Sequence, residues 1–338
     1  SSSPAATPDS CAVMTAFNSQ SPEPRSRAVV MSALRRASLM NQWMPVSWLM
    51  KGFIGHSEYL SFDIRHGSYL SAGAVTAGMA SSGADYPAIG VAHLTKRFGS
   101  LLAVDDLSFE VERGQLFGLL GSNGAGKTTA LKVLTGLLRP DQGSVTVDGV
   151  DVLRRPVEAK RRIGFLPEAP ALYDLLTAKE FLEMIGTLRG MSPGKLDRRT
   201  DELLEMMELS EFAKNNIGTY SRGMRQKLAF AAAVIHEPKI LILDEPLSGL
   251  DPRFGKLFKG WIKDLTGSGG SVLMSTHVTG NAEELCDRVA IIDRGKVLAT
   301  GTVREVLSAA GAQTLEDAFV TLVGGNRWQR SPSLPPTH

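Results

Sequence analysis

A glycine-rich segment of the chain has the spacing of a loop that cradles phosphate. Residues 121–128 read Gly-Ser-Asn-Gly-Ala-Gly-Lys-Thr, which fits the pattern G-x-x-x-x-G-K-[ST] at every fixed position. Glycines let the backbone curl until successive N–H groups point at phosphate oxygens. The amine of Lys127 should reach the β- and γ-phosphates of a nucleotide, and the hydroxyl of Thr128 should ligate Mg²⁺. The segment therefore predicts a binding site for Mg·ATP.

The sequence on either side of the loop favours this interpretation over a chance glycine turn. An apolar run at 116–120 predicts a strand before the loop, and Leu131, Leu134 and Leu138 predict one face of a helix after it. Gly136 and Pro140 are expected to end that helix. The N-terminus of that helix, which carries the positive end of the helix dipole, would point at the same anion. We expect the following residues to contact the nucleotide: Gly121, Ser122, Asn123, Gly124, Ala125, Gly126, Lys127, Thr128 and Thr129.

Two adjacent carboxylates follow a second apolar run. Asp244 and Glu245 come directly after residues 240–243, which have the composition of a strand buried on both faces of a parallel sheet. Ligands of open α/β folds bind at the carboxyl edge of such a sheet. Asp244 could hold Mg²⁺ through water, and Glu245 could orient the water that attacks a γ-phosphate. The alternative is a solvated surface pair, but adjacent carboxylates repel, and a metal dication makes the arrangement tolerable.

Strands and helices alternate along the part of the chain that carries these residues. Patterns typical of strands occur at residues 89–94, 107–111, 116–120, 145–147, 240–243, 272–274, 289–292 and 297–299. Residues 172–235 are predicted to be helical, and Thr177 with Glu180 predicts a capping box at the start of one helix. A last amphipathic helix carries Leu315 and Leu322. The alternation predicts an α/β fold.

The composition and net charge of the chain limit the classes of molecule that it could bind. Hydrophobic residues make up 43% of the chain and charged residues 21%, which is typical of a globular protein. The formal net charge of +2 gives no support to a nucleic-acid partner, and we expect none. No uncharged apolar run approaches the roughly 18 residues that a membrane-spanning helix needs. Any membrane role must therefore come through a partner chain.

Residues 88–322 resemble the nucleotide-binding domain of ABC transporters. Besides the phosphate loop and the acidic pair, five features carry the resemblance in the family's order. They are Phe98, where an aromatic ring usually stacks on adenine, Leu-Pro-Glu at the Q-loop (166–168), Tyr-Ser-Arg-Gly-Met at the signature motif (220–224), Ser-Gly-Leu-Asp at the D-loop (248–251), and the switch histidine His277.

The resemblance implies a fold and a set of roles. The fold is a P-loop NTPase core, with a parallel sheet flanked by helices, an antiparallel β subdomain, and a helical signature subdomain at about 170–236. Ser221 and Gly223 would contact the γ-phosphate held by another subunit, so that ATP joins a head-to-tail dimer. The expected catalytic residues are Glu245, His277 and Lys127, the metal ligands are Thr128, Asp244 and Glu168, and the further nucleotide contacts are Phe98, Ser221, Gly223 and Asp251.

Taken one at a time, three of these residues have simpler interpretations. Ser221 fits a helix cap, His277 fits a histidine with satisfied hydrogen bonds at a strand end, and Phe98 fits a core side chain. Family position favours the functional role for each, and for Phe98 its place between an arginine and Gly99 also favours partial exposure.

The sequence departs from the family pattern at three positions. Arg222 replaces the first glycine of the signature and Met224 replaces its glutamine. Both changes resemble the drug-, antibiotic- and polysaccharide-export branches. Glu168 replaces the usual Q-loop glutamine and adds a negative charge, which weakens its claim as a metal ligand more than its role in coupling.

The resemblance implies the ATP-hydrolysing subunit of an ABC transporter. It would act at the cytoplasmic side of the membrane with separate polytopic subunits, as a homodimer or with a paralogue, and residues 314–319 resemble export-type subunits. The alternative is a soluble ABC ATPase acting on ribosomes or DNA. Translation-associated members carry two cassettes, and DNA-repair members insert a long coiled coil that the spacing of Lys127 and Ser221 leaves no room for. A non-hydrolysing binding module is disfavoured by Glu245 and His277.

Outside the cassette we expect little fixed structure. Residues 1–86 are rich in Ser, Ala, Gly and Pro without a sustained period, so we expect a disordered leader or an upstream extension. Residues 87–323 form the expected ATPase domain, and 324–338 an expected flexible tail.

Overall fold

The computed structural model describes residues 86–324. The leader expected at 1–86 lies outside the described residues except for Tyr86, whose ring centroid lies 4.8 Å from the Arg113 guanidinium carbon. The tail expected at 324–338 likewise lies outside them except for Gly324, which ends a helix.

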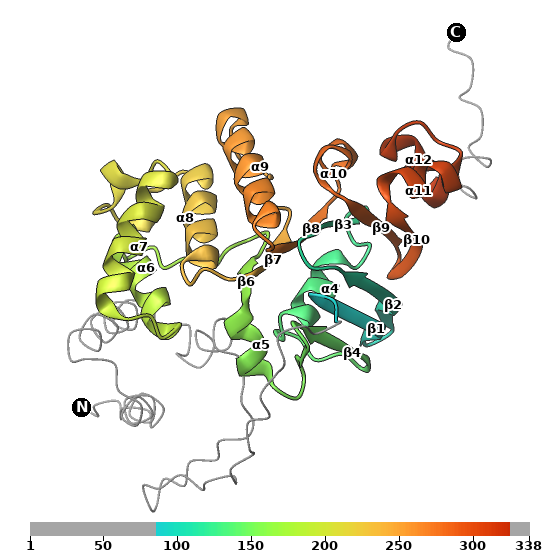
Figure 1. The fold of residues 1–338 in the computed structure, drawn as a ribbon, viewed down its shortest axis with the longest axis horizontal. Helices are drawn as coiled ribbons and strands as arrows, with labels where there is room; N and C mark the ends of the chain where they lie inside the picture. Colours follow the sequence, from blue (N-terminus) through green and yellow to red (C-terminus); the bar gives the residue numbers. More distant parts are fainter. Residues whose placement is uncertain (1–85, 325–338) are drawn as a thin grey trace, which may run out of the picture.

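A six-stranded sheet forms the centre of the molecule (Figure 1). Its order is β10 (Lys296–Thr302), β9 (Arg288–Asp293), β3 (Leu116–Leu120), β8 (Ser271–Thr276), β7 (Ile240–Asp244) and β6 (Ile163–Leu166). All neighbours pair in parallel except β9 and β10, which are antiparallel around a turn. Strands β3, β7 and β8 are buried along their whole length, as expected for strands covered on both faces.

A second sheet is antiparallel and lies beside the first. Its order is β2 (Leu101–Val111), β1 (Ile89–Phe98), β4 (Gln142–Val147) and β5 (Val150–Asp151). Phe109 of β2 stacks on Phe117 of β3 with ring centroids 5.2 Å apart, which joins the two sheets. The predicted antiparallel β subdomain is therefore confirmed.

Helices cover both faces of the central sheet and form the helical subdomain at one end (Figure 1). They are α4 (Lys127–Leu134), α5 (Pro156–Arg162), α6 (Ala178–Leu188), α7 (Pro193–Met206), α8 (Arg222–Val234), α9 (Pro252–Gly267), α10 (Thr279–Leu285), α11 (Val303–Ala310) and α12 (Leu315–Gly324). The predicted capping box of Thr177 and Glu180 begins α6. None of these helices is both long enough and apolar enough to cross a membrane.

Alternate side chains of the central strands point to opposite faces of the sheet and belong to two different hydrophobic clusters. Leu241 and Leu243 of β7 join a cluster with α6, α8, α9 and the C-terminal helices, whereas Ile240 and Ile242 join a cluster with α4 and the antiparallel sheet. The period of two residues thus fixes both faces of the sheet. The phosphate loop and the acidic pair leave this sheet at the carboxyl ends of β3 and β7.

The helix after the phosphate loop is shorter than the apolar pattern predicts. It ends at Leu134, because Gly136 adopts a φ of +65° and the N–H groups of Leu137 and Leu138 both bond to Lys132 O. Leu138 therefore packs from a turn rather than from the helix face.

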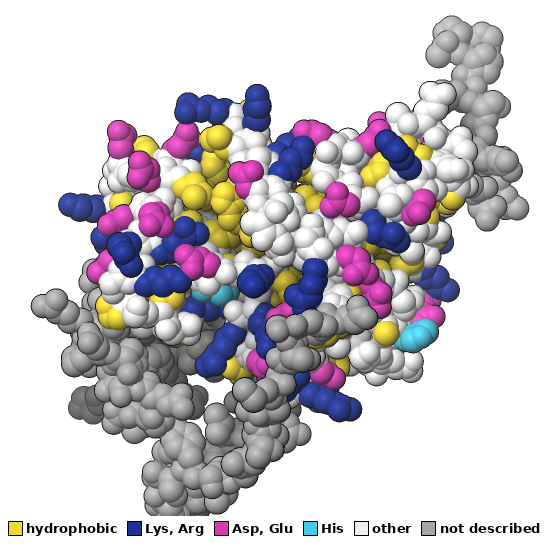
Figure 2. Space-filling model, viewed as in Figure 1, with side chains coloured by type: hydrophobic (Ala, Val, Ile, Leu, Met, Phe, Trp, Pro, Cys, Tyr) yellow, Lys and Arg dark blue, Asp and Glu magenta, His cyan; other side chains and the backbone are white. Residues whose placement is uncertain are grey.

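The charged surface has no single sign. Figure 2 shows apolar side chains gathered over α8 and α9, with lysine and arginine interspersed among aspartate and glutamate over much of the same face. Leu257 of α9 is 51% exposed.

Candidate active site

The phosphate loop joins β3 to α4, and its glycines hold backbone positions at which a side chain would be strained or would clash. Gly126 caps α4 with a φ of +107°. A Cβ added there would lie 2.4 Å from Ala103 O, whereas one added at Gly124, where φ is +82°, would have no atom of residues 86–324 within 4 Å. Only glycine tolerates both the dihedral angle and the close approach of β2 at residue 126. The loop can therefore adopt this curve only with the glycine that the pattern specifies.

Lys127 is buried within the loop. Its Nζ atom donates to Gly121 O at 2.6 Å and to Ser122 O at 3.3 Å. It also lies 3.4 Å from Glu245 Oε1. The ammonium group thus stands between the loop and the acidic pair, held by carbonyl oxygens and one carboxylate.

Asp244 is the last residue of β7 and is 1% exposed. Ser275 of the neighbouring strand β8 donates from its Oγ atom to Asp244 Oδ1 at 2.5 Å. Among residues 86–324, no lysine, arginine or histidine lies within ion-pair distance of Asp244, in contrast to Glu245. A buried carboxylate with a single hydroxyl partner is costly unless a cation completes the site.

Glu245 turns back toward the phosphate loop. Its φ of +49° is unusual for a residue with a side chain, and its N–H donates to Ser275 Oγ at 3.1 Å. Glu245 Oε1 lies 2.9 Å from His277 Nδ1 as well as 3.4 Å from Lys127 Nζ. Neither contact has hydrogen-bond geometry, so this buried oxygen lacks a hydrogen-bond donor among the described residues.

A pocket of about 560 Å³ lies over the loop, which is within the range typical of small-molecule sites. Phe98, at the end of β1 and 47% exposed, stands in its wall. Glu168 and Glu245 line it together with Lys127 and other loop residues. Residues distant in sequence therefore meet around one space.

Seven predicted residues do not line this pocket: Gly121 and Ala125 of the loop, Asp244, His277, which lines a neighbouring pocket with Glu245, and Ser221, Gly223 and Asp251. Ser221 caps α8 and accepts a hydrogen bond from Met224 N at 3.2 Å. Asp251 caps α9, and the hydrogen bond from Phe254 N lowers the pKa of Asp251. Gly223 is in the first turn of α8. Within one copy of the chain, none of Ser221, Gly223 and Asp251 lines this pocket.

The structure adds residues that sequence reasoning missed. Ser275 is the partner of Asp244, and the parallel register of β7 and β8 places them opposite each other. Leu101 and Arg294 line the pocket, although neither belongs to a motif. Ser275 could have been found from the sequence, because it directly follows the apolar run at 272–274 and the carboxyl ends of parallel strands meet at one edge of a sheet.

Comparison with known proteins identifies the family. Residues 104–248 match the family model described as ABC transporter. The chain is 38% identical to the linearmycin resistance ATP-binding protein LnrL of Bacillus subtilis (strain 168), over 66% of this chain and 72% of that protein. It is 40% identical to the daunorubicin resistance ATP-binding protein DrrA3 of Streptomyces coeruleorubidus, over 68% and 72% of the two chains.

Solved structures agree. An ATP-binding subunit of an ABC transporter superposes with a TM-score of 0.66 at 31% identity, covering 70% of this chain and 99% of the other. A dimeric ATP-binding cassette in a post-hydrolysis state, bound to ADP and Pi, gives a TM-score of 0.59 at 26% identity, covering 63% and 98%. The chain belongs to the ABC transporter family and is an ATP-binding subunit of it, an ATPase whose hydrolysis of ATP drives transport.

Proposed function

We propose that the chain binds Mg·ATP in the pocket over the phosphate loop and drives export through separate membrane subunits. The observation that carries the proposal is the convergence of the loop, the buried acidic pair and His277 at one edge of the sheet. Lys127 would exchange Gly121 O and Ser122 O for the β- and γ-phosphates, because phosphate oxygens are the stronger acceptors for an ammonium group.

The residues at the loop fit a magnesium ion. Thr128 and Asp244 would hold it, and the buried carboxylate of Asp244 supports this assignment because no cation of residues 86–324 compensates it. The ion would neutralise charge that develops on the phosphates. Glu168 is exposed at the pocket wall, where it could approach the metal through water. Magnesium commonly takes only one or two carboxylates together with phosphates and water.

Glu245 is proposed as the residue that orients and polarises the attacking water. Glu245 lies beside Lys127, which would bind the γ-phosphate, so Glu245 would lie close to the reacting phosphate. Its Oε1 atom has no hydrogen-bond donor among the described residues. A water molecule could supply that donor. His277 would hold the glutamate in place from the other side and sense the γ-phosphate.

Phe98 is proposed to stack on the adenine ring. Replacing it with alanine should weaken ATP binding about tenfold, because stacking of a base on an aromatic side chain contributes about 1–3 kcal/mol. Isothermal titration with ATP measures the change. Phe212→Ala removes a similarly exposed aromatic ring outside the pocket and should leave the affinity unchanged. Equal affinities for wild type and Phe98→Ala would reject the stacking role.

Ser221, Gly223 and Asp251 are proposed to complete the nucleotide site of a second subunit. Their separation from the pocket of their own copy supports this view, since they would otherwise have no nucleotide to contact. The solved dimer of a related cassette with bound ADP and Pi is consistent with it. The second subunit would be another copy of the chain or a paralogue.

We propose that a helix of the membrane subunit docks between the helical subdomain and the central sheet, at the cytoplasmic side of the membrane. A groove lies there, and the loop at 167–172 connects it to the nucleotide pocket: Pro167 and Ala169 line the groove, while Glu168 lines the pocket. A change at the γ-phosphate could therefore move the wall of the groove. The antibiotic-resistance and Nod factor export names of similar proteins favour export as the direction.

Affinity capture tests the transport function. The full chain, tagged and isolated in detergent from its own cell, should retain a polytopic membrane protein at near-equal stoichiometry. The retained protein should be identified by mass spectrometry, with a tagged unrelated ATPase as the control. Recovery of ribosomes or DNA in its place would favour a soluble ABC ATPase and contradict the proposal.

A further inference from the structure

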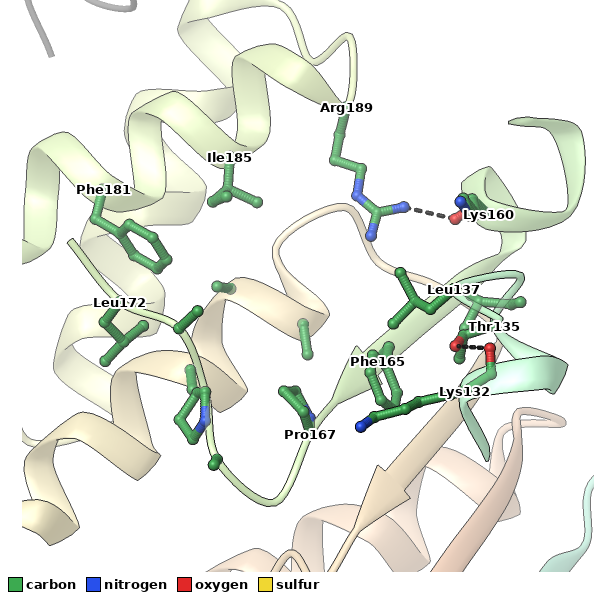
Figure 3. A pocket seen from close by; sticks show the side chains of 17 residues that line it. Lys132, Thr135, Leu137, Lys160, Phe165, Pro167, Leu172, Phe181, Ile185 and Arg189 are labelled. Carbon is green, nitrogen blue, oxygen red and sulfur yellow. Dashed lines mark hydrogen bonds between the residues drawn. The ribbon is translucent and has the colours of Figure 1, made fainter. Parts of the chain in front are cut away.

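The groove beside the 167–172 loop combines an apolar floor with positively charged side chains (Figure 3). Its volume is about 230 Å³, so it can accept one or two side chains rather than a whole helix. Phe165, Phe181 and Ile185 supply apolar walls, and small alanines of α8 keep the floor open. Three cations also line the groove: Lys132 of α4, Lys160 of α5, and Arg189, which caps the C-terminus of α6.

Among the described residues that line the groove, none is a counter-ion for its cations. Arg189 directs its guanidinium toward the groove and donates from Nη1 to Lys160 O at 2.5 Å (Figure 3). Burial lowers the pKa of Arg189 to about 10, and burial together with the nearby Arg189 lowers the pKa of Lys160. No acidic side chain of residues 86–324 lines the groove or offsets either shift.

Half-buried cations in an apolar surrounding favour one kind of ligand. A carboxylate would replace lost hydration and could accept two hydrogen bonds from the arginine fork. A lysine or arginine side chain of a partner would be repelled by Arg189 and Lys160 in the groove and would also lose its hydration there. Both effects strongly disfavour binding of a basic side chain. An adjacent apolar side chain would fill the space beside Phe181 and Ile185.

We infer that the docked segment of the membrane subunit carries an aspartate or glutamate that pairs with Arg189 and Lys160, next to an apolar side chain that enters the groove. Lys132, which is exposed at the rim, adds attraction for the same carboxylate. The inference rests on the proposed transport function and specifies the chemistry by which this chain selects its membrane subunit.

The test uses the complex of the full chain with the membrane protein that it captures. The photo-reactive amino acid p-benzoylphenylalanine is placed at Leu137, which lines the groove and is partly exposed, and the cross-linked peptide is identified by mass spectrometry. The peptide should come from a cytoplasmic segment of the membrane subunit and contain an aspartate or glutamate. A cross-link to a segment without an acidic residue, to lipid, or to residues 1–85 of the same chain would overturn the inference.

Charge reversal then tests the ion pair itself. Arg189→Glu should reduce recovery of the complex at least about 30-fold, because truncating one side of a buried charge pair costs 2–5 kcal/mol or more in known interfaces. Arg189→Lys should retain most of it. Changing the cross-linked carboxylate of the membrane subunit to arginine should restore binding to Arg189→Glu, and this rescue also shows that the variant folds. Lys263→Glu, an exposed reversal on α9 outside the groove, is the matched control and should bind normally.

The two levels of the proposal fail in different ways. If the wild-type chain captures no polytopic membrane protein, the transport function is wrong. If it captures one whose recovery is the same with Arg189→Glu, or whose binding is not rescued by the swapped charge, only the inferred carboxylate contact is wrong. Lys132→Glu supplies a second reversal at an exposed position and should weaken recovery severalfold.

Discussion

Glu245→Gln should lower the rate of ATP hydrolysis about 10²–10⁴-fold, the contribution typical of a positioned general base. A glutamine side chain is nearly isosteric but cannot accept a proton from water. The substitution also removes the negative charge 3.4 Å from Lys127 Nζ, so the lysine becomes freer to bind phosphate and ATP affinity should not fall. ATP that binds without being hydrolysed should accumulate in a dimer.

Three measurements on the purified chain check this prediction. Phosphate release gives the turnover number, titration with ATP gives the affinity, and light scattering with ATP gives the dimer fraction. Glu205→Gln, an exposed change on α7, is the matched control, and EDTA added to wild type should abolish turnover if magnesium is required. Near-normal hydrolysis by Glu245→Gln would show that another group activates the water.

Gly126→Ala should abolish detectable ATP binding and lower the free energy of unfolding by about 3 kcal/mol or more. Two costs act together: a side chain at a φ of +107° is strained, and the new Cβ would lie 2.4 Å from Ala103 O. Relief of the clash must move the phosphate loop away from β2. The amide N–H groups would then no longer converge on the phosphates.

The matched control separates backbone strain from the close approach. Gly269 has a φ of +89° and follows the end of α9, and no atom of residues 86–324 would lie within 4 Å of an added Cβ. Gly269→Ala should cost only about 1–2 kcal/mol and leave ATP binding intact. Urea unfolding and ATP titration of both variants give the comparison. If Gly126→Ala binds ATP with wild-type affinity, the tight curve of the loop against β2 is not required for binding.

Local patterns were sufficient for much of the fold. The apolar run at 240–243 predicted a doubly buried parallel strand, and β7 is one because both faces of its sheet are covered. Thr177 and Glu180 predicted the start of α6 because a capping box involves neighbours three residues apart. Such features depend on contacts within one element or on a period that a sheet imposes.

Helices α5, α9, α10 and α11 are not among the elements that the sequence patterns above predict. Helices α5, α10 and α11 have only seven or eight residues, and helices this short owe their stability to packing rather than to propensity. Helix α9 did carry local signals, since Asp251 caps it and Pro252 occupies its first turn. It was therefore predictable from its own residues.

The sequence by itself determined which residues have the chemistry of a nucleotide site: glycines for a curved loop, a lysine and a threonine after them, and two carboxylates after a buried strand. Only the tertiary structure decided their contacts. The pairing of Asp244 with Ser275, the approach of Glu245 to Lys127 and His277, and the meeting of Arg189 with Lys160 all join elements far apart in the chain. Distances of this kind depend on which strands pair and on how the helices pack against the sheet, and the residues of one segment alone do not specify either.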